Sequence, residues 1–260
     1  FLPLSSLLKF YTNYFTLPNI FYDIPVHACA TAYMSGTNIK KNAEVHSKNP
    51  YMLKLDFEDF FHSIKGGDFI RFLQKNDHLS ILEEDKKRLL RILFWLPSKN
   101  GELQLSIGAP SSPLLSNAIM YQFDKLIYDY CSEKYVIYTR YADDMTFSMT
   151  DIKMRGVILK KVEAVLASLA FPTLRLNKRK TIFGSKAHRR IITGLILAND
   201  GSISLGRERK RIIRAQIYNL SRGTLTETEK KRLQGLIAFA RDIEPAFIER
   251  MEKKYGQLLF

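Results

Sequence analysis

VIYTRYADDMTFSMT, residues 136–150, places an acidic pair between two runs rich in β-branched and aromatic residues. Such runs favour strands, and a short polar tip between two of them predicts a β-hairpin that turns at Ala142, Asp143 and Asp144. Two adjacent Asp residues disfavour a strand unless they form a turn or bind something. An isolated Asp-Asp pair is most simply a polar turn, so its interpretation depends on the surrounding sequence.

A second acidic residue ends an apolar strand upstream. In YMLKLDF, residues 51–57, Leu53, Leu55 and Phe57 alternate with a second set that includes Asp56, which predicts a strand with two unlike faces. Taken alone, this segment fits a polar turn and a functional carboxylate equally well. Nucleotidyl transfer uses two divalent cations roughly 4 Å apart, and Mg²⁺ is usually held by one or two carboxylates. Carboxylates at strand ends in apolar surroundings are what such a site needs.

Composition limits the class of protein and its partners. The chain has 260 residues, 46% of them hydrophobic, which is enough for one large domain or a main domain with a small appendage. The formal net charge of +14 favours a polyanionic partner, with nucleic acid ahead of an anionic membrane. A merely basic protein is the plain alternative. Cys29 and Cys131 form neither a metal pattern nor a disulfide framework, which fits buried thiols in a reducing, intracellular compartment.

The chain begins with FLPLSSLLKFYTNYF, which is apolar but lacks the basic start and cleavage site of a signal peptide. We expect a core helix there and, because no methionine opens the chain, further residues upstream. No apolar run reaches the roughly 18 residues of a membrane span.

The remaining segments predict a mixed α and β chain with a helical end. Residues 68–95, the part of 108–134 after its Gly/Pro/Ser turn, and residues 154–171 have helical patterns, and residues 175–205 predict short strands with turns. From Gly206 onward the pattern is helical, and Thr226 to Glu229 form a capping box at the start of one helix. A boundary near 200–206 therefore separates an α+β part from a small, basic, helical part.

Four segments together resemble the conserved motifs of reverse transcriptases. YADDMTFS resembles the YADD box, LKLDFEDFFHSI the first aspartate motif, GAPSSPLLSN the motif between them, and LRLNKRKTIF the downstream LxINxxKT motif. They occur in the family's order over residues 51–183. The resemblance implies a right-hand polymerase, with fingers and palm over residues 1–203 and a helical thumb over 204–260.

Three more segments narrow the resemblance to bacterial retron reverse transcriptases. NAEVH at 42–46 is similar to the NAxxH signature, ITGL at 192–195 to the VTG signature, and LGRERKRIIRAQI to the segment after it. The resemblance implies a cytoplasmic bacterial enzyme that uses dNTPs and a cognate structured RNA as template and primer source. Synthesis would start at an internal guanosine 2′-OH and leave branched, RNA-linked DNA. It also implies a role in phage defence with a separate effector protein, and no membrane partner.

The resemblance assigns catalytic roles to a few residues. Asp56 and Asp143 would bind two Mg²⁺ ions, with Mn²⁺ also possible, and Asp144 would complete the cluster. The backbone carbonyl of Phe57 would be an extra ligand. Lys180 would protonate or neutralise the leaving pyrophosphate; otherwise it is a surface charge facing phosphate.

The resemblance also assigns the nucleotide side of the site. Phe61 lies five residues after Asp56, at the position of a steric gate against a 2′-OH, although simple core packing is the alternative. The other expected contacts for nucleotide, template or primer end are Gly108, Ala109, Pro110, Tyr141 and Ala142. Two features depart from the family. Ser106-Ile107 stand where Pro-Gln is usual, and the basic fingers segment for the triphosphate is not recognisable upstream of Asp56, so we expect it to precede the chain's first residue.

Nucleic-acid contacts are expected at two places. Asn42 and His46 belong to the NAxxH signature, and His46 is a structural or RNA-contacting residue rather than a metal ligand, because no second His or Cys lies at ligand spacing. Further along, helical spacing puts Ile213, Ile217 and Leu220 opposite a basic face. That face consists of Arg207, Arg211, Arg214 and Tyr218.

Three other functions remain open from the sequence. The first is a reverse transcriptase of another lineage, such as an intron maturase or a template-independent defence polymerase, against which the NAxxH and VTG segments argue. The second is a scaffold that holds nucleic acid and a toxin, against which the intact aspartate set argues. The third is an inactive nucleic-acid-binding protein, which leaves the paired aspartates unexplained. The sequence does not specify the cognate RNA, the effector, the oligomeric state or the defence trigger.

Overall fold

A four-stranded antiparallel sheet forms the centre of the protein. The computed structural model describes residues 24–79, 81–98 and 101–256, so the helix predicted at the start of the chain lies outside the described residues. The sheet has the order β4-β5-β1-β6. The strands are β1 (Tyr51–Asp56), β4 (Ile137–Tyr141), β5 (Asp144–Met149) and β6 (Ile182–Ser185). The strand and the hairpin predicted from the sequence are both confirmed.

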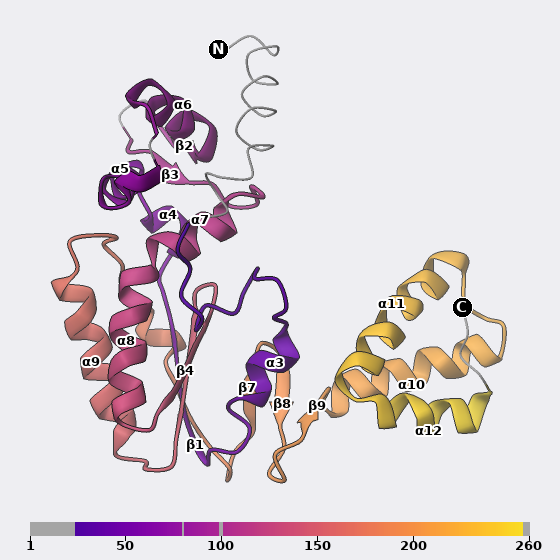
Figure 1. Cartoon of the computed structure of the whole chain (residues 1–260). Coiled ribbons are helices and arrows are strands. Elements are labelled where there is room, and N and C mark those ends of the chain that lie inside the picture. The colour runs from indigo at the N-terminus through magenta and orange to yellow at the C-terminus, as the bar shows by residue number, and fades with distance from the viewer. Residues whose placement is uncertain (1–23, 80, 99–100, 257–260) are drawn as a thin grey trace.

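The two faces of this sheet have opposite character. Leu53 and Leu55 of β1 and Phe147 of β5 lie on one face and are fully buried in the larger hydrophobic core. That face is covered by α8 (Tyr121–Glu133) and α9 (Met154–Ser168), which lie side by side in Figure 1. Because side chains alternate along a strand, Asp56 points to the other face, which is polar.

Short elements surround one end of the sheet. They are α4 (Phe60–Ser63), α5 (Gly66–Lys75), η1 (Asp77–Leu79), α6 (Glu83–Leu93), β2 (Phe94–Trp95), β3 (Gln104–Leu105) and α7 (Ser112–Ile119). The prediction of one helix over 68–95 is wrong. The helix ends at Asn76, whose backbone leaves helical geometry and whose side chain caps the carbonyl of Phe72 at 2.8 Å. Asn competes with the helical backbone in this way, which favours helix ends. The helix expected after the Gly/Pro/Ser turn is likewise divided into α7 and α8 at Met120.

A second hydrophobic core joins three short strands to the C-terminal helices. Its elements are α3 (Ile39–Glu44), β7 (Arg190–Ile192), β8 (Leu195–Leu197), β9 (Ile203–Ser204), α10 (Arg207–Ser221), α11 (Glu227–Ile243) and α12 (Pro245–Tyr255). In Figure 1 the three long helices project from the sheet on the side opposite α8 and α9. The predicted capping box is confirmed, since Thr226 and Glu229 bond each other's backbone N–H at the start of α11. No helix in the described ranges is long and apolar enough to cross a membrane.

The junction between strands and helices is tightly built. Gly206 has φ +83° and precedes α10, and a Cβ there would lie 2.5 Å from Cδ1 of Ile196, so only glycine fits. Glu244 accepts hydrogen bonds from the Ser204 hydroxyl and the Leu205 N–H and pairs with Lys210. The second core thus includes residues on both sides of position 203, and the domain boundary stays a prediction.

Candidate active site and nucleic-acid surface

The sheet register brings the predicted carboxylates together. Asp56 is the last residue of β1 and lies directly opposite Asp144, the first residue of β5, which in turn pairs with Tyr141 at the end of β4. Directly opposed residues share a face of the sheet, so both carboxylates belong to the polar face. Asp143 lies beside them in the turn of the hairpin. Residues far apart in the chain therefore meet at one end of the two central strands.

Asp143 has an unusual electrostatic environment. Burial raises its pKa above the ordinary value, and the neighbouring carboxylates Asp56 and Asp144 raise it further, against the opposing effects of a backbone hydrogen bond and of Lys180. Carboxylates that crowd one another in this way favour a bound proton or a cation.

Two lysines partly neutralise the cluster. The Nζ atom of Lys180 lies 3.1 and 3.2 Å from the two carboxylate oxygens of Asp56, and that hydrogen bond raises the pKa of Lys180. The Nζ atom of Lys54 lies 3.6 Å from Oδ2 of Asp144. The Asp56 side chain is buried whereas Lys180 is largely exposed, so the lysine can leave without disturbing the core.

The segment before Lys180 is attached to the strand that carries Asp56. The N–H of Asn177 donates to the Asp56 carbonyl at 2.8 Å, and the N–H of Glu58 donates to the Arg175 carbonyl at 2.9 Å. These two bonds form an antiparallel bridge between Phe57 and Leu176, and neither of them uses the Phe57 carbonyl. The 3₁₀ turn η2 (Lys178–Lys180) then directs Lys180 back toward the cluster. Local sequence spacing could not reveal this pairing.

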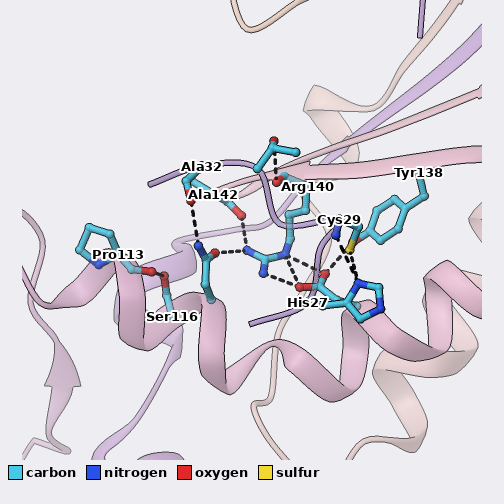
Figure 2. A network of polar contacts seen from close by, with 11 residues as sticks. His27, Cys29, Ala32, Pro113, Ser116, Tyr138, Arg140 and Ala142 are labelled. Carbon is cyan, nitrogen blue, oxygen red and sulfur yellow. Dashed lines mark hydrogen bonds and ion pairs between the residues drawn. The ribbon is translucent and has the colours of Figure 1, made fainter. Parts of the chain in front are cut away.

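A buried polar network is hydrogen-bonded to the hairpin turn. Arg140 is fully buried, donates to both oxygens of Asp124, and donates from Nη1 to the Asn117 side chain at 3.0 Å and the Ala142 carbonyl at 2.9 Å. The Tyr138 hydroxyl also donates to Asp124 at 2.9 Å. Figure 2 shows the guanidinium at the centre of these bonds. Ala142 has φ +56°, a strained value for a residue with a Cβ.

This network was missed in the sequence. Its only signals are an arginine within a β-prone arm and an aspartate on the apolar side of a helix.

The two signature segments of the sequence pack against each other. Ala43 of α3 shares the second core with Ile192 and Leu195, which flank the turn of the β7–β8 hairpin. Thr193 and Gly194 form that two-residue turn, both with positive φ, as tight hairpins require. The Thr193 hydroxyl donates to the carbonyl of Ile39.

Comparison with known proteins identifies the family. The family described as reverse transcriptase (RNA-dependent DNA polymerase) matches residues 13–197. Retron Ec83 reverse transcriptase of Escherichia coli is 42% identical over 234 residues, which cover 89% of this chain and 75% of that protein. The chain belongs to the retron reverse transcriptases. It is therefore an RNA-directed DNA polymerase whose substrates are a template RNA and dNTPs.

Other similarities agree. Retron Ec73 reverse transcriptase of Escherichia coli is 32% identical over 260 residues, covering 97% of this chain and 81% of that protein. The structure of the foamy viral protease-reverse transcriptase dRH in complex with ds DNA has a TM-score of 0.51 and 18% identity, covering 86% of this chain and 33% of that chain. At that identity the likeness concerns the fold alone. The predicted α+β polymerase fold is confirmed, and this chain spans about a third of the viral protein.

The residues that are predicted to contact the nucleotide in this retron reverse transcriptase are exposed or half-buried, apart from Ala142, which is buried. Phe61 is half-buried on α4 and packs edge-on against Phe60, with ring centroids 5.3 Å apart. Gly108 has φ +82° and is exposed, as is Pro110, whereas Ala109 is half-buried. Ile107, where the family has Gln, is 64% exposed. The assigned roles of these residues stay predictions.

Asn42 and His46, the expected nucleic-acid contacts of the NAxxH segment, are both buried, which for His46 agrees with the structural alternative; their contact with nucleic acid stays a prediction. The His46 ring nitrogens bond the hydroxyls of Ser148 and Thr139, each at 2.8 Å, and Thr31 donates to Asn42 at 3.1 Å. Burial lowers the His46 pKa to about 3, so the ring is neutral. The NAxxH histidine of this retron reverse transcriptase therefore fastens the chain onto the polar face of the sheet.

The predicted basic face of α10 is exposed. Ile213 and Ile217 are fully buried and Leu220 is half-buried, as the helical period predicted. The opposite face presents Arg207, Arg211, Arg214 and Tyr218. Within this face, the guanidinium of Arg214 lies 5.4 Å from the centre of the Phe247 ring.

Proposed function

We propose that this chain copies part of a cognate structured RNA into branched, RNA-linked DNA at a two-metal site formed by Asp56, Asp143 and Asp144. The observation that carries the proposal is the register that puts Asp56 opposite Asp144, with Asp143 in the adjoining turn. The resemblance of NAEVH and ITGL to retron signatures supports the branched product and a dedicated RNA.

The residues at the turn suit divalent cations. Within the described ranges, no three His, Cys, Asp or Glu side chains already converge as a metal site. The donor set nevertheless consists of oxygen ligands, which Mg²⁺ prefers, and the raised pKa of Asp143 comes partly from carboxylates that a cation would stabilise. Asp56, Asp143, Asp144 and the Phe57 carbonyl would hold the ions, which would stabilise charge on the attacking and leaving oxygens. Mn²⁺ would suit the same ligands.

The protein's own groups divide the remaining work. Lys180, which pairs with Asp56 here, would turn to the leaving pyrophosphate once Asp56 is engaged elsewhere. Phe61, five residues after Asp56, would exclude an incoming nucleotide whose sugar carries a 2′-OH. Tyr141 and Ala142 would lie under the primer end, and Gly108, Ala109 and Pro110 would bring backbone close to template and nucleotide.

We assign fingers and palm to residues 1–203 and a thumb to residues 204–260. The exposed face of α10 supports a duplex or RNA contact in the thumb, because arginine binds phosphates bidentately and an exposed tyrosine can stack on a base. A role in phage defence with a separate effector protein rests on the family resemblance.

Nucleic acid bound to the protein tests this function. The wild-type chain and Asp143→Asn would be purified from cells that carry the cognate RNA, and the bound nucleic acid would be sequenced with and without ribonuclease. We expect single-stranded DNA of discrete length joined to RNA in the wild type, and RNA alone in the variant. RNA without linked DNA in both, or DNA in both, would contradict the proposal.

A further inference from the structure

Tyr33 is an exposed aromatic residue next to the candidate active site, outside every motif recognised in the sequence. Tyr33 is 57% exposed. The centroid of its ring lies 6.4 Å from that of the Tyr141 ring, and the two ring planes are tilted by 34°. Burial by its surroundings, then Tyr141 and then Asp143 raise the Tyr33 pKa, which agrees with this position beside the turn. A large exposed aromatic so close to catalytic carboxylates calls for a ligand.

The backbone presents Tyr33 rigidly. Tyr33 has φ +63°, a strained conformation for a residue with a Cβ. The preceding residues are fastened on both sides, because Thr31 N–H donates to the Arg140 carbonyl at 2.8 Å and the Asn117 side chain donates to the Ala32 carbonyl at 2.9 Å. Figure 2 shows Ala32 joined in this way to the network around Arg140. Strain that the surroundings maintain is concentrated at ligand-binding sites.

One network therefore holds two neighbouring features. Arg140 bonds the Ala142 carbonyl in the hairpin turn, and its strand pairs with residues 29–31, which lead to Tyr33. The relative position of Tyr33 and Asp143 is set by buried bonds rather than by loop preference. An aromatic ring fixed beside the carboxylates of the cluster suits a flat, neutral partner, and a nucleobase is such a partner.

We propose that Tyr33 stacks on a base of the RNA–DNA substrate beside the primer end, as an aromatic platform paired with Tyr141. The proposal rests on the function proposed for the aspartate cluster. Stacking is tolerant of base identity, so Tyr33 would contribute to substrate affinity and to placement of the strand end rather than to sequence choice.

Tyr135 supplies a matched control. It is also a tyrosine with positive φ, at +55°, and is 90% exposed, but it precedes β4 and so lies at the opposite end of that strand from Tyr141. Tyr33→Ala and Tyr135→Ala therefore both remove an exposed tyrosine whose backbone has a left-handed conformation. Only the former removes a ring beside Asp143.

The test uses a template–primer with 2-aminopurine at the primer end, whose fluorescence falls when the base stacks. We expect Tyr33→Ala to weaken binding of the template–primer roughly 5- to 150-fold, the range for one lost stacking contact. The fall in 2-aminopurine fluorescence on binding should be lost as well. Tyr33→Phe should restore both, Tyr135→Ala should match the wild type, and the KM for template–primer should rise more than kcat falls in Tyr33→Ala. Thermal melting verifies folding, and Tyr33→Leu replaces Tyr33→Ala if the latter does not fold.

Unchanged affinity and quenching in a folded Tyr33→Ala or Tyr33→Leu protein would overturn the proposal, as would equal losses in Tyr135→Ala. Asp143→Asn separates this outcome from failure of the proposed function. If Asp143→Asn is inactive while the Tyr33 variants bind normally, only the stacking role is wrong. If Asp143→Asn retains synthesis, the aspartate assignment itself is wrong.

Discussion

Arg140 donates a hydrogen bond from Nη1 to the Ala142 carbonyl at 2.9 Å, so a fully buried guanidinium holds the turn that carries Asp143. Its charge is balanced by Asp124, which is also fully buried. Burial of such a pair is costly unless every group is bonded, and here the side chains of Asn117 and Tyr138 complete the set. The turn that carries Asp143 is thus bonded to a buried charge pair.

Asp124→Asn should destabilise the protein by about 3–5 kcal/mol, because it leaves the Arg140 charge buried and uncompensated. Urea denaturation measures the change. Asp129→Asn is the matched control on the same helix, since Asp129 pairs with Lys125 in an exposed ion pair of the kind that contributes little. Equal stability of the two variants would mean that the buried pair does not support the fold.

Asp143→Asn should abolish DNA synthesis without loss of folding or RNA binding, because it removes one carboxylate of the cluster. The pKa of Asp143 is raised in the folded state, first by burial and then by Asp56 and Asp144. Its ionised form therefore opposes folding above the ordinary pKa of 3.8, and the amide should melt no lower than the wild type at pH 7. Primer extension and thermal melting measure both effects, with Asp129→Asn as control. Synthesis within a few-fold of wild type would contradict the site.

His46 should make the free energy of unfolding depend on pH. Its folded pKa of about 3 lies below the ordinary value of 6.5, so the unfolded chain binds the extra proton. The contribution of His46 to the free energy of unfolding is fully present above pH 6.5. It falls as the pH is lowered toward 3, by up to about 1.4 kcal/mol per pH unit. His46→Gln should reduce that slope, whereas His188→Gln, at an exposed position, should retain it. Denaturation at pH 5, 6 and 7 gives the slopes, and identical slopes in all three proteins would exclude this role.

Phe61→Ala should raise ribonucleotide incorporation relative to deoxyribonucleotide, because a steric gate acts by repelling the wrong sugar. Incorporation efficiencies for both sugars measure the ratio. Phe183→Ala, which removes an exposed ring on β6, should leave it unchanged. If both efficiencies fall in parallel in Phe61→Ala, then the ring only packs against Phe60 and the core.

Replacing Arg211 and Arg214 with Gln should weaken RNA binding and flatten its salt dependence. Each lost phosphate contact removes roughly 0.7–0.9 from the log–log slope, so the pair removes up to about twice that. Synthesis on saturating template should largely survive, because the aspartate cluster is untouched. Lys153→Gln with Lys160→Gln is the charge-matched control, at two exposed positions, the N-cap of α9 and a residue within that helix.

An unchanged salt slope in the arginine double variant would mean that the α10 face does not bind RNA. The search would then move to Lys178, Arg179 and Arg189. Arg190 is not a candidate, because it is buried and donates to the Ala198 carbonyl.

Local features of this protein follow from its sequence. The alternation of Leu53 and Leu55, the turn at Asp143, the capping box at Thr226 and the buried line of Ile213 and Ile217 are all confirmed. Each depends on the period of a strand or helix or on the chemistry of a turn, and these act over a few neighbouring residues. The motifs that identify the family are local in the same sense.

Other features were decided only when the chain folded. His46 is a buried anchor because Ser148 and Thr139 arrive from two strands, and Tyr33 reaches Tyr141 only through the strand pairing of Arg140. A sequence pattern shows that a face is apolar or polar but not which distant segment covers it. Burial and hydrogen-bond partners are properties of that pairing. The sequence by itself therefore determined the strands that carry the aspartates and the carboxylates themselves, and the tertiary structure decided what surrounds and supports them.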